Sequence, residues 1–241
     1  MPREKRNYSR VLLKISGQGF CKEDDFGLDL EQVRFLADEV AECVRTGKEI
    51  AVVVGGGNFI RGAIASEKTG LGRATADYMG MLATIINGMA LQDTLETLDF
   101  ETRLMSALTA SDVAEPFIRR RCTRHLEKGR VVILVGGTGN PYFTTDTQAA
   151  LRASEIKADV LLKATKVDGI YSADPVKDPA AQRFDVISYE EILKRKLEIM
   201  DSSAVDLCAR NSIPILVFSL RESGNLLRAL GGEEIGTLVT A

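Results

Sequence analysis

Residues 131–146 read VVILVGGTGNPYFTTD, and this stretch joins a strand-like run to a loop rich in glycine, aromatic and polar residues. The first five residues are apolar throughout, which is typical of a strand buried on both faces of a parallel sheet. Three glycines, an Asn-Pro step, two aromatic residues, three threonines and an aspartate then follow. Such a loop is not needed merely to turn a corner, and the rest of the sequence indicates what it holds.

Five further apolar runs of strand length occur along the chain, at 11–15, 50–54, 103–108, 159–164 and 215–220. Helical patterns lie between them. Residues 28–47 predict a helix with Asp29 as its N-cap and Gly47 just past its end, and Ser188 is a candidate cap for a later helix. Apolar strands that alternate with helices predict an α/β fold with a mainly parallel sheet covered on both faces.

The composition is that of a globular protein, with 45% hydrophobic and 27% charged residues among 241. A net charge of −3 argues against general nucleic-acid binding, so we expect small molecules or other subunits as partners. The four cysteines lie far apart and form no CxxC pair, which favours a reduced, cytoplasmic protein. The apolar run at 11–15 is too short for a signal peptide or a membrane span, so no membrane contact is expected.

Residues 75–98 predict one long helix that is apolar on almost every face between 78 and 91. Such a helix must be buried on more than the side that faces the sheet. It is either a central core helix or part of a subunit interface, and we expect a homo-oligomer.

Glycine-rich loops follow three of the predicted strands, at 16–19 (SGQG), 55–58 (GGGN) and 136–140 (GGTGN). Glycine lets the backbone approach a ligand closely, and amides at a helix N-terminus suit an anion. One such loop would be an ordinary turn, but three loops at the same topological position favour a phosphate-binding site along one edge of the sheet. No GxxxxGK[ST] and no Rossmann GxGxxG fingerprint is present.

Two lysines, Lys14 in LLKISG and Lys163 in LLKAT, stand at the same place near the ends of their strands. Each is either a strand-end lysine whose stem covers apolar surface or a cation that meets phosphate oxygens. Arg61 follows the second glycine loop and can bind a phosphate through two parallel hydrogen bonds. Asp77 is either a favourable negative charge in the first turn of a helix or a residue that contacts the ligand. His125, the only histidine, lies in a basic stretch and gives no support to His-dependent catalysis.

No metal-ligand cluster is visible, so any Mg²⁺ is expected to arrive with a nucleotide. Residues 166–182 are the most irregular part of the chain, and they predict an exposed loop after the strand at 159–164.

The motifs LLKISG, GGGNFIRG, DYMGMLAT, GGTGNPYFTTD, LLKATKVDGIYSADP and IMD occur in this order. Together they closely resemble the bacterial uridylate kinases of the amino acid kinase superfamily. The resemblance implies a single domain over residues 1–241, folded as a three-layer αβα sandwich around a mostly parallel eight-stranded sheet. It implies transfer of the ATP γ-phosphoryl group to UMP, which serves pyrimidine nucleotide (CTP) biosynthesis. The N-terminal half, about 1–160, would hold UMP, and the C-terminal half, about 161–241, would hold ATP.

Site residues carry over from the family motifs position by position. The ATP-binding set would be Lys14, Ile15, Ser16, Gly17, Gly57, Arg61, Thr165, Tyr171 and Asp174. The UMP-binding set would be Gly56, Asp77, Thr138, Gly139, Asn140, Pro141, Tyr142, Phe143, Thr144 and Thr145. Lys14 and Lys163 would neutralise charge on the transferring group, with Asp146 and Asp201 as the acids of the site. Asp201 either orients one lysine or is a plain helix N-cap, and Asp146 has the same ambiguity.

The same resemblance implies a homohexamer of dimers, with GTP as an activator and UTP as an inhibitor. SGQGF departs from the usual SGEAL, and GGGNFIRG transposes two bulky residues, but neither change removes a phosphate-facing group. Gln92 and Glu96 stand where some GTP-responsive relatives carry basic residues, which weakens the expectation of GTP activation.

Two other functions remain open at this point. Molybdate-storage proteins resemble the same family and bind without acting as kinases, although the retained lysines and aspartates favour catalysis. A kinase for another acceptor, such as CMP or a small carboxylate or carbamate, is the third reading.

Overall fold

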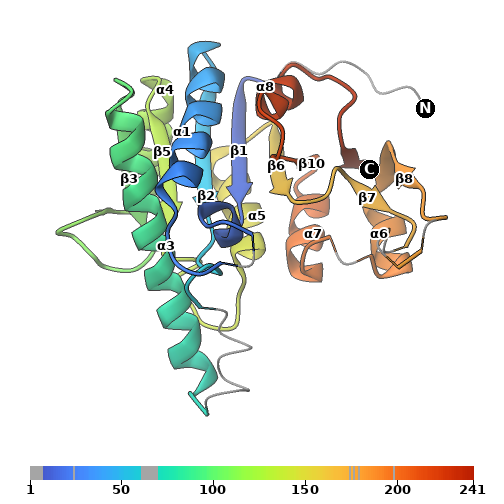
Figure 1. Cartoon of the computed structure of the whole chain (residues 1–241), viewed down its shortest axis with the longest axis horizontal. Coiled ribbons are helices and arrows are strands. Elements are labelled where there is room, and N and C mark those ends of the chain that lie inside the picture. The colour runs from blue at the N-terminus through green and yellow to red at the C-terminus, as the bar shows by residue number, and fades with distance from the viewer. Residues whose placement is uncertain are drawn as a thin grey trace.

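The computed structural model describes residues 8–23, 25–60, 70–173, 175, 177–178, 180–197 and 199–241. Nine strands form the central sheet: β1 (Arg10–Ile15), β2 (Glu49–Val54), β3 (Thr102–Ser106), β4 (Glu115–Pro116), β5 (Val131–Val135), β6 (Val160–Thr165), β9 (Val186–Ser188), β10 (Ile215–Ser219) and β11 (Thr237–Thr240). Their order is β4-β3-β5-β2-β1-β6-β10-β11-β9. The part from β3 to β10 can be followed from left to right in Figure 1. Every neighbouring pair is parallel except β10 and β11.

All six predicted strands are confirmed within two residues. The sheet has nine strands rather than eight, and the short strands β4 and β9 form its two edges. The stretch at 166–182 is not wholly a loop. It contains β7 (Ile170–Tyr171), which pairs with β8 (Arg183–Phe184), directly after the stretch, as a separate two-stranded ribbon.

Helices connect the strands: η1 (Gly17–Phe20, a 3-10 helix), α1 (Leu30–Arg45), α3 (Arg73–Glu96), α4 (Arg119–Glu127), α5 (Thr145–Ile156), α6 (Tyr189–Arg195), α7 (Ser202–Arg210) and α8 (Asn225–Leu230). The predicted caps are confirmed: Asp29 accepts from Gln32 N at 3.0 Å and Ser188 from Glu191 N at 3.1 Å. Gly47, just past α1, has φ +77°, a conformation that glycine adopts without strain.

Two hydrophobic cores lie on opposite faces of the sheet, because successive strand residues point to opposite sides. Leu13 packs in the core beneath α1, α3 and α8, whereas its neighbour Leu12 packs in the core beneath α4, α5 and α7. The expected three-layer αβα architecture is confirmed (Figure 1).

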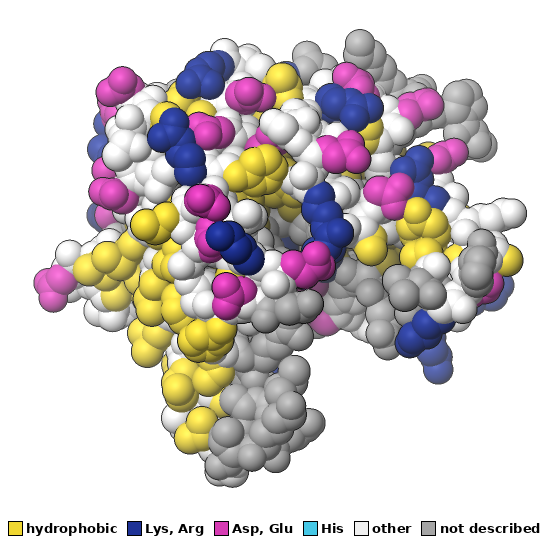
Figure 2. Space-filling view, in the orientation of Figure 1, with side chains coloured by type: hydrophobic (Ala, Val, Ile, Leu, Met, Phe, Trp, Pro, Cys, Tyr) yellow, Lys and Arg dark blue, Asp and Glu magenta, His cyan; other side chains and the backbone are white. Residues whose placement is uncertain are grey.

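The long helix α3 is buried on one side and exposed on another. Met81, Ile85, Leu91 and Leu95 lie in the interior. Tyr78, Met79, Leu82, Ile86 and Met89 are each between 42% and 53% exposed. Figure 2 shows hydrophobic side chains gathered over this helix, which runs beyond the end of the sheet in Figure 1. We call these five residues the apolar face of α3.

Within the described ranges, no helix is long and apolar enough to cross a membrane.

Candidate active site

Three glycine loops meet at the carboxyl edge of the sheet, where β1, β2 and β5 end. The first two are packed backbone to backbone. A Cβ atom on Gly17 would lie 2.3 Å from the nitrogen of Gly57, and one on Gly55 would lie 2.6 Å from the nitrogen of Gly17. Any side chain at either position would separate the loops, so glycine is required for this close approach.

Lys14, Asp146 and Lys163 form a buried ionic cluster at this edge. The Nζ of Lys14 lies 2.8 Å from Oδ1 of Asp146, and the Nζ of Lys163 lies 2.7 Å from Oδ2. Lys14 is only 7% exposed and Lys163 only 8%. Lysine is almost never this buried unless it is paired, and here two ammonium groups share one carboxylate. The cluster therefore carries a net positive charge.

The pKa values follow from this unequal pairing. Burial alone would raise the pKa of Asp146, but the ammonium groups of Lys14 and Lys163 hold that pKa below its ordinary value. Burial lowers the pKa of Lys163, against the raising effect of Asp146, and the charge of Lys14 lowers it further. One carboxylate does not fully compensate two desolvated cations, so the cluster can accept an additional anion.

Asp201 ties the N-termini of two helices together. It caps α7 by accepting from Ala204 N at 2.9 Å, and it also accepts from the hydroxyl groups of Thr144 and Thr147. Burial raises the pKa of its carboxyl, but these hydrogen bonds bring that pKa below its ordinary value.

Of the two roles left open for Asp201, the structure shows the helix N-cap, and the ion pairs with Lys14 and Lys163 are made by another acid. The carboxylate that pairs with both lysines is that of Asp146, in the first turn of α5. Asp201 instead fixes Thr144, the N-cap of that same helix, and so acts on the cluster through α5.

A cavity of about 350 Å³ opens on one side of the cluster. Its wall holds these members of the predicted UMP-binding and ATP-binding sets: Lys14, Ser16, Gly17, Gly56, Gly57, Asp77, Phe143, Thr144 and Thr145. We call it the first cavity. The sequence thus predicted much of one wall, although these residues come from segments far apart in the chain.

Asp77 is already engaged in this structure. Its carboxylate accepts from Arg73 Nε at 2.9 Å and from Tyr142 N at 2.8 Å. The guanidinium of Arg73 also lies 5.7 Å from the centre of the Tyr142 ring. Arg73 also lines the first cavity and was not predicted from the sequence. Its position four residues before Asp77 was the available signal, because such pairs meet on a helix.

Besides Tyr142, four residues of the predicted UMP-binding set lie in the outer part of the loop: Thr138, Gly139, Asn140 and Pro141. They are not among the described residues that line the first cavity. Thr138 Oγ1 and Asn140 N are 3.3 Å apart, and Gly139 has φ +82°. This tip is held by its own local hydrogen bonds.

A second cavity of about 870 Å³ opens on the side of α6 and α7. Lys163, Asp146 and Asp201 line it together with apolar residues, among them Leu193 and Met200. The ionic cluster therefore lies between two cavities, with Lys14 on the wall of one and Lys163 on the wall of the other. The sequence did not reveal the apolar wall of the second cavity, because α6 and α7 read as ordinary amphipathic helices.

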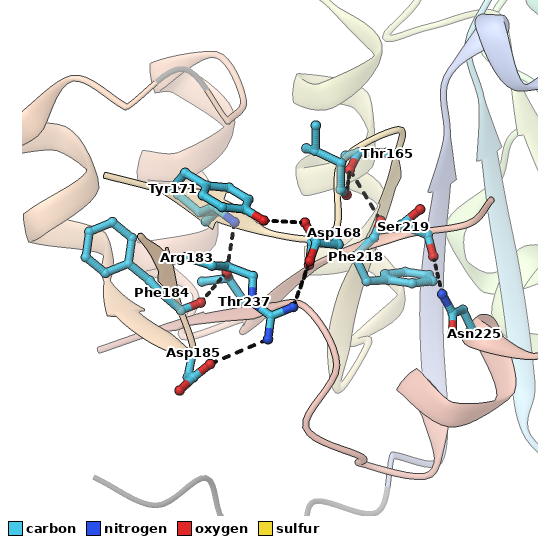
Figure 3. A network of polar contacts seen from close by, with 12 residues as sticks. Thr165, Asp168, Tyr171, Arg183, Phe184, Asp185, Phe218, Ser219, Asn225 and Thr237 are labelled. Carbon is cyan, nitrogen blue, oxygen red and sulfur yellow. Dashed lines mark hydrogen bonds and ion pairs between the residues drawn. The ribbon is translucent and has the colours of Figure 1, made fainter. Parts of the chain in front are cut away.

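The remaining residues of the predicted ATP-binding set are more dispersed. Ile15 and Thr165 line a third cavity of about 370 Å³, and Tyr171 lines a fourth of about 550 Å³. Arg61 and Asp174 lie outside the described residues. Figure 3 shows that Tyr171 belongs to a polar network in which its hydroxyl donates to Asp168 at 2.7 Å and Arg183 pairs with the same carboxylate at 3.0 Å.

Among the residues whose placement is described, no group of three or more His, Cys, Asp or Glu side chains could hold a metal ion. The arrangement of the site is that of an anion-binding centre. Lys14, three glycine loops and the N-terminus of α5 line the first cavity, and Lys163 lies next to them through its ion pair with Asp146. Such a centre can stabilise the charge that is spread over a transferring phosphoryl group.

Comparison with known proteins agrees with this geometry. The model of the amino acid kinase family matches residues 9–219. The crystal structure of UMP kinase from Bacillus anthracis is 35% identical with a TM-score of 0.95, covering 98% of this chain and 97% of that chain. UMP kinase from Ureaplasma parvum is also 35% identical, with a TM-score of 0.91 over 98% and 100% of the two chains. Uridylate kinase from Archaeoglobus fulgidus is 31% identical, with a TM-score of 0.74 over 95% and 99%.

Proposed function

This chain belongs to the amino acid kinase family, and we propose that it is a UMP kinase, which transfers the γ-phosphoryl group of ATP to UMP. The products would be UDP and ADP, and UDP would enter pyrimidine nucleotide synthesis. The observation that carries the proposal is the pair of buried lysines on one carboxylate between two cavities. The UMP kinases that are 35% identical over nearly the whole chain support the choice of acceptor.

UMP is assigned to the first cavity, in the N-terminal half of the chain. Gly56, Asp77, Thr144 and Thr145 would contact it there, with the loop at 138–143 over it. The phosphates of ATP would meet Lys14, Ser16, Gly17 and Gly57, and the rest of ATP would lie over the C-terminal half, which carries Thr165 and Tyr171. This division would bring the two nucleotides together at the ionic cluster.

The chemistry requires positioning and positive charge. The attacking group would be a phosphate oxygen of UMP, which is already largely ionised at neutral pH because its second pKa is about 6. No general base is therefore needed, and Asp146 serves the reaction as an ionised partner that fixes Lys14 and Lys163. The two ammonium groups would neutralise charge on the transferring group in a site where little water competes.

Mg²⁺ is proposed to arrive with ATP. The carboxylate of Asp146 is occupied by two lysines and that of Asp201 by hydroxyl and amide donors. Neither carboxylate is free to coordinate a metal ion in this arrangement, so the ion would be held by the phosphates. When bound, it would neutralise phosphate charge.

The protein is also proposed to be a cytoplasmic homo-oligomer. The apolar face of α3 supports self-association, because a contiguous exposed apolar surface is unusual on a monomer. The hexameric state, GTP activation and UTP inhibition are proposed from the family resemblance alone. Glu96, at the end of α3, accepts hydrogen bonds from the side chains of Gln92 and Thr102. This position therefore holds a hydrogen-bonded carboxylate where some GTP-responsive relatives carry a basic residue.

A coupled ADP-release assay with ATP and Mg²⁺ tests the proposed reaction. The acceptors are UMP, CMP, dUMP and N-acetylglutamate, with no acceptor as the blank. We expect ADP release to depend on UMP and to be much faster with UMP than with the others. Equal rates with CMP and UMP would contradict the assignment of UMP, and rates no higher than the blank would contradict kinase activity.

A further inference from the structure

Two polar side chains of α3 reach two different glycine loops. Thr84 Oγ1 accepts from Gly136 N at 2.8 Å, at the start of the loop that follows β5. Asn87 Nδ2 donates to Gly55 O at 2.7 Å, at the start of the loop that follows β2. The two residues lie on adjacent turns of one helix face and are 1% and 0% exposed. One helix therefore contacts the first residue of both loops.

The contact to the loop at 55–58 is reinforced by a buried pair of amides. Asn87 Nδ2 also donates to Asn58 Oδ1 at 2.7 Å, and Asn58 Nδ2 donates back to Asn87 Oδ1 at 3.0 Å. Asn58 Nδ2 further donates to Gly27 O at 2.7 Å. A buried amide that lost these partners would be costly, so the pair holds the loop in one position.

Close packing joins the same helix to the second residue of each loop. A Cβ atom on Gly56 would lie 2.4 Å from Gly80 O, and one on Gly137 would lie 2.9 Å from Met81 Cγ. The loops therefore cannot move relative to α3 without opening both a hydrogen bond and a packed contact.

We propose that Thr84 and Asn87 are positioning residues that fix the two loops relative to each other, with α3 as their common frame. The catalytic meaning of this inference rests on the proposed function, in which the loop at 55–58 meets phosphates and the loop at 136–145 holds UMP. Thr84 also lines the first cavity, but its hydroxyl is engaged in both directions, since it accepts from Gly136 N at 2.8 Å and donates to Met81 O at 2.6 Å. We therefore assign its effect to Gly136. Asn87 acts through Gly55 and Asn58.

The kinetic test compares Thr84→Val and Asn87→Leu with Thr94→Val. The hydroxyl of Thr94 donates to Ala90 O within the same helix, so its removal is a matched control for the loss of a threonine hydroxyl. Losing one bond should raise the KM for UMP about fivefold in Thr84→Val, with the KM for ATP nearly unchanged. Asn87→Leu should lower kcat about tenfold, because misplaced phosphates react slowly. Thr94→Val should match the wild type.

Hydrogen–deuterium exchange tests the positioning without relying on catalysis. Thr84→Val should speed exchange in residues 131–143 but not in 51–60, and Asn87→Leu should do the reverse. If Asn87→Leu does not fold, Asn87→Ser removes the same bonds without adding apolar bulk. Equal acceleration of both segments in every variant, or in none, would overturn the inference. If wild-type protein fails to phosphorylate UMP, the proposed function falls while the exchange pattern still decides the positioning roles.

Discussion

Lys14 and Lys163 are direct register partners on the neighbouring parallel strands β1 and β6, and each binds a different oxygen of the Asp146 carboxylate. Register partners on adjacent parallel strands point to the same face of the sheet. Both lysines therefore lie on the side covered by α5 and α7, where Asp146 in the first turn of α5 meets them. Sheet pairing thus places two cations beside one acid, although the two lysines are far apart in the sequence.

Replacing Lys14 with Met should abolish most of the turnover without unfolding the protein. The substitution removes one of two cations at the place where phosphoryl charge is spread, so kcat should fall about 1000-fold. Steady-state kinetics and circular dichroism measure the two effects. Lys128→Met, at an exposed lysine just beyond α4, is the control and should keep wild-type kinetics. A kcat within tenfold of wild type for Lys14→Met would contradict the role of this lysine.

Lys163→Met should lose activity and yet be at least as stable as the wild type. The pKa of Lys163 is lowered by burial and by Lys14, so its protonated form is less favourable in the folded protein than in the unfolded chain. Removing the charge removes this penalty, and the thermal midpoint at neutral pH should equal or exceed that of the wild type.

The penalty at Lys163 also has a pH dependence of known sign. Between the lowered folded pKa and the ordinary value of 10.5, the unfolded chain binds more protons, so wild-type stability rises with pH. The difference in thermal midpoint between Lys163→Met and the wild type should therefore shrink at alkaline pH. A thermal midpoint of Lys163→Met more than about 5 °C below that of the wild type at neutral pH would contradict the proposal that the Lys163 charge destabilises the folded protein. For a chain of this size, such a shift corresponds to well over about 1 kcal/mol in the free energy of unfolding.

Asp201→Asn should lower stability and kcat/KM together, whereas Asp29→Asn should leave kcat/KM unchanged. Both aspartates are helix N-caps, and Asn is a good N-cap, so capping is preserved in both variants. Only Asp201 also accepts hydrogen bonds from Thr144 and Thr147. A hydrogen bond to a charged group contributes at most about 1.5–3 kcal/mol to the free energy of unfolding. Differential scanning calorimetry and steady-state kinetics should separate the two variants.

The pKa of Asp201 is lowered in the folded protein, so the unfolded chain binds more protons in acid. Its stabilising contribution is complete above the ordinary value of 3.8 and is lost as the pH falls through the lower folded pKa. The difference in thermal midpoint between wild type and Asp201→Asn should narrow below pH 3.8. A constant difference across that range would show that the carboxylate charge does not matter.

The sequence predicted the central strands well, because a strand buried on both faces is apolar at every position. It did not predict β4, β7, β8, β9 or β11, which are two to four residues long and have unremarkable composition. Such short strands form because neighbouring strands present unpaired backbone groups to them. Local patterns do not carry that information.

The sequence predicted individual residues of the candidate site but not the contacts between them. Lys14 and Lys163 drew attention because each stands at the same place in its strand. That Asp146 bridges them depends on the adjacency of β1 and β6, which no local pattern encodes. For Asp201 the sequence left two roles open, a helix N-cap or a partner of one lysine, because its position before α7 fits both. Its bonds to Thr144 and Thr147 exist only in the folded chain.

Leu82→Glu should convert the protein to a smaller species in solution. Leu82 is 53% exposed on the apolar face of α3, where a charge would oppose burial between subunits. Leu30→Glu is the control, because Leu30 is a leucine that is 78% exposed at the start of another helix, α1. Light scattering at micromolar protein should show a reduced mass for Leu82→Glu alone. A monomeric wild type, or equal masses for all three proteins, would contradict the interface.

The measurement that most directly tests the proposed phosphoryl transfer from ATP to UMP is phosphorus-31 NMR of the wild-type protein with ATP, Mg²⁺ and UMP. The γ-phosphate signal of ATP should disappear at the rate at which the β-phosphate signal of UDP appears, with little inorganic phosphate. Without UMP, the ATP signals should persist. Inorganic phosphate in place of UDP, or unchanged spectra with all three reactants present, would contradict transfer to UMP at this site.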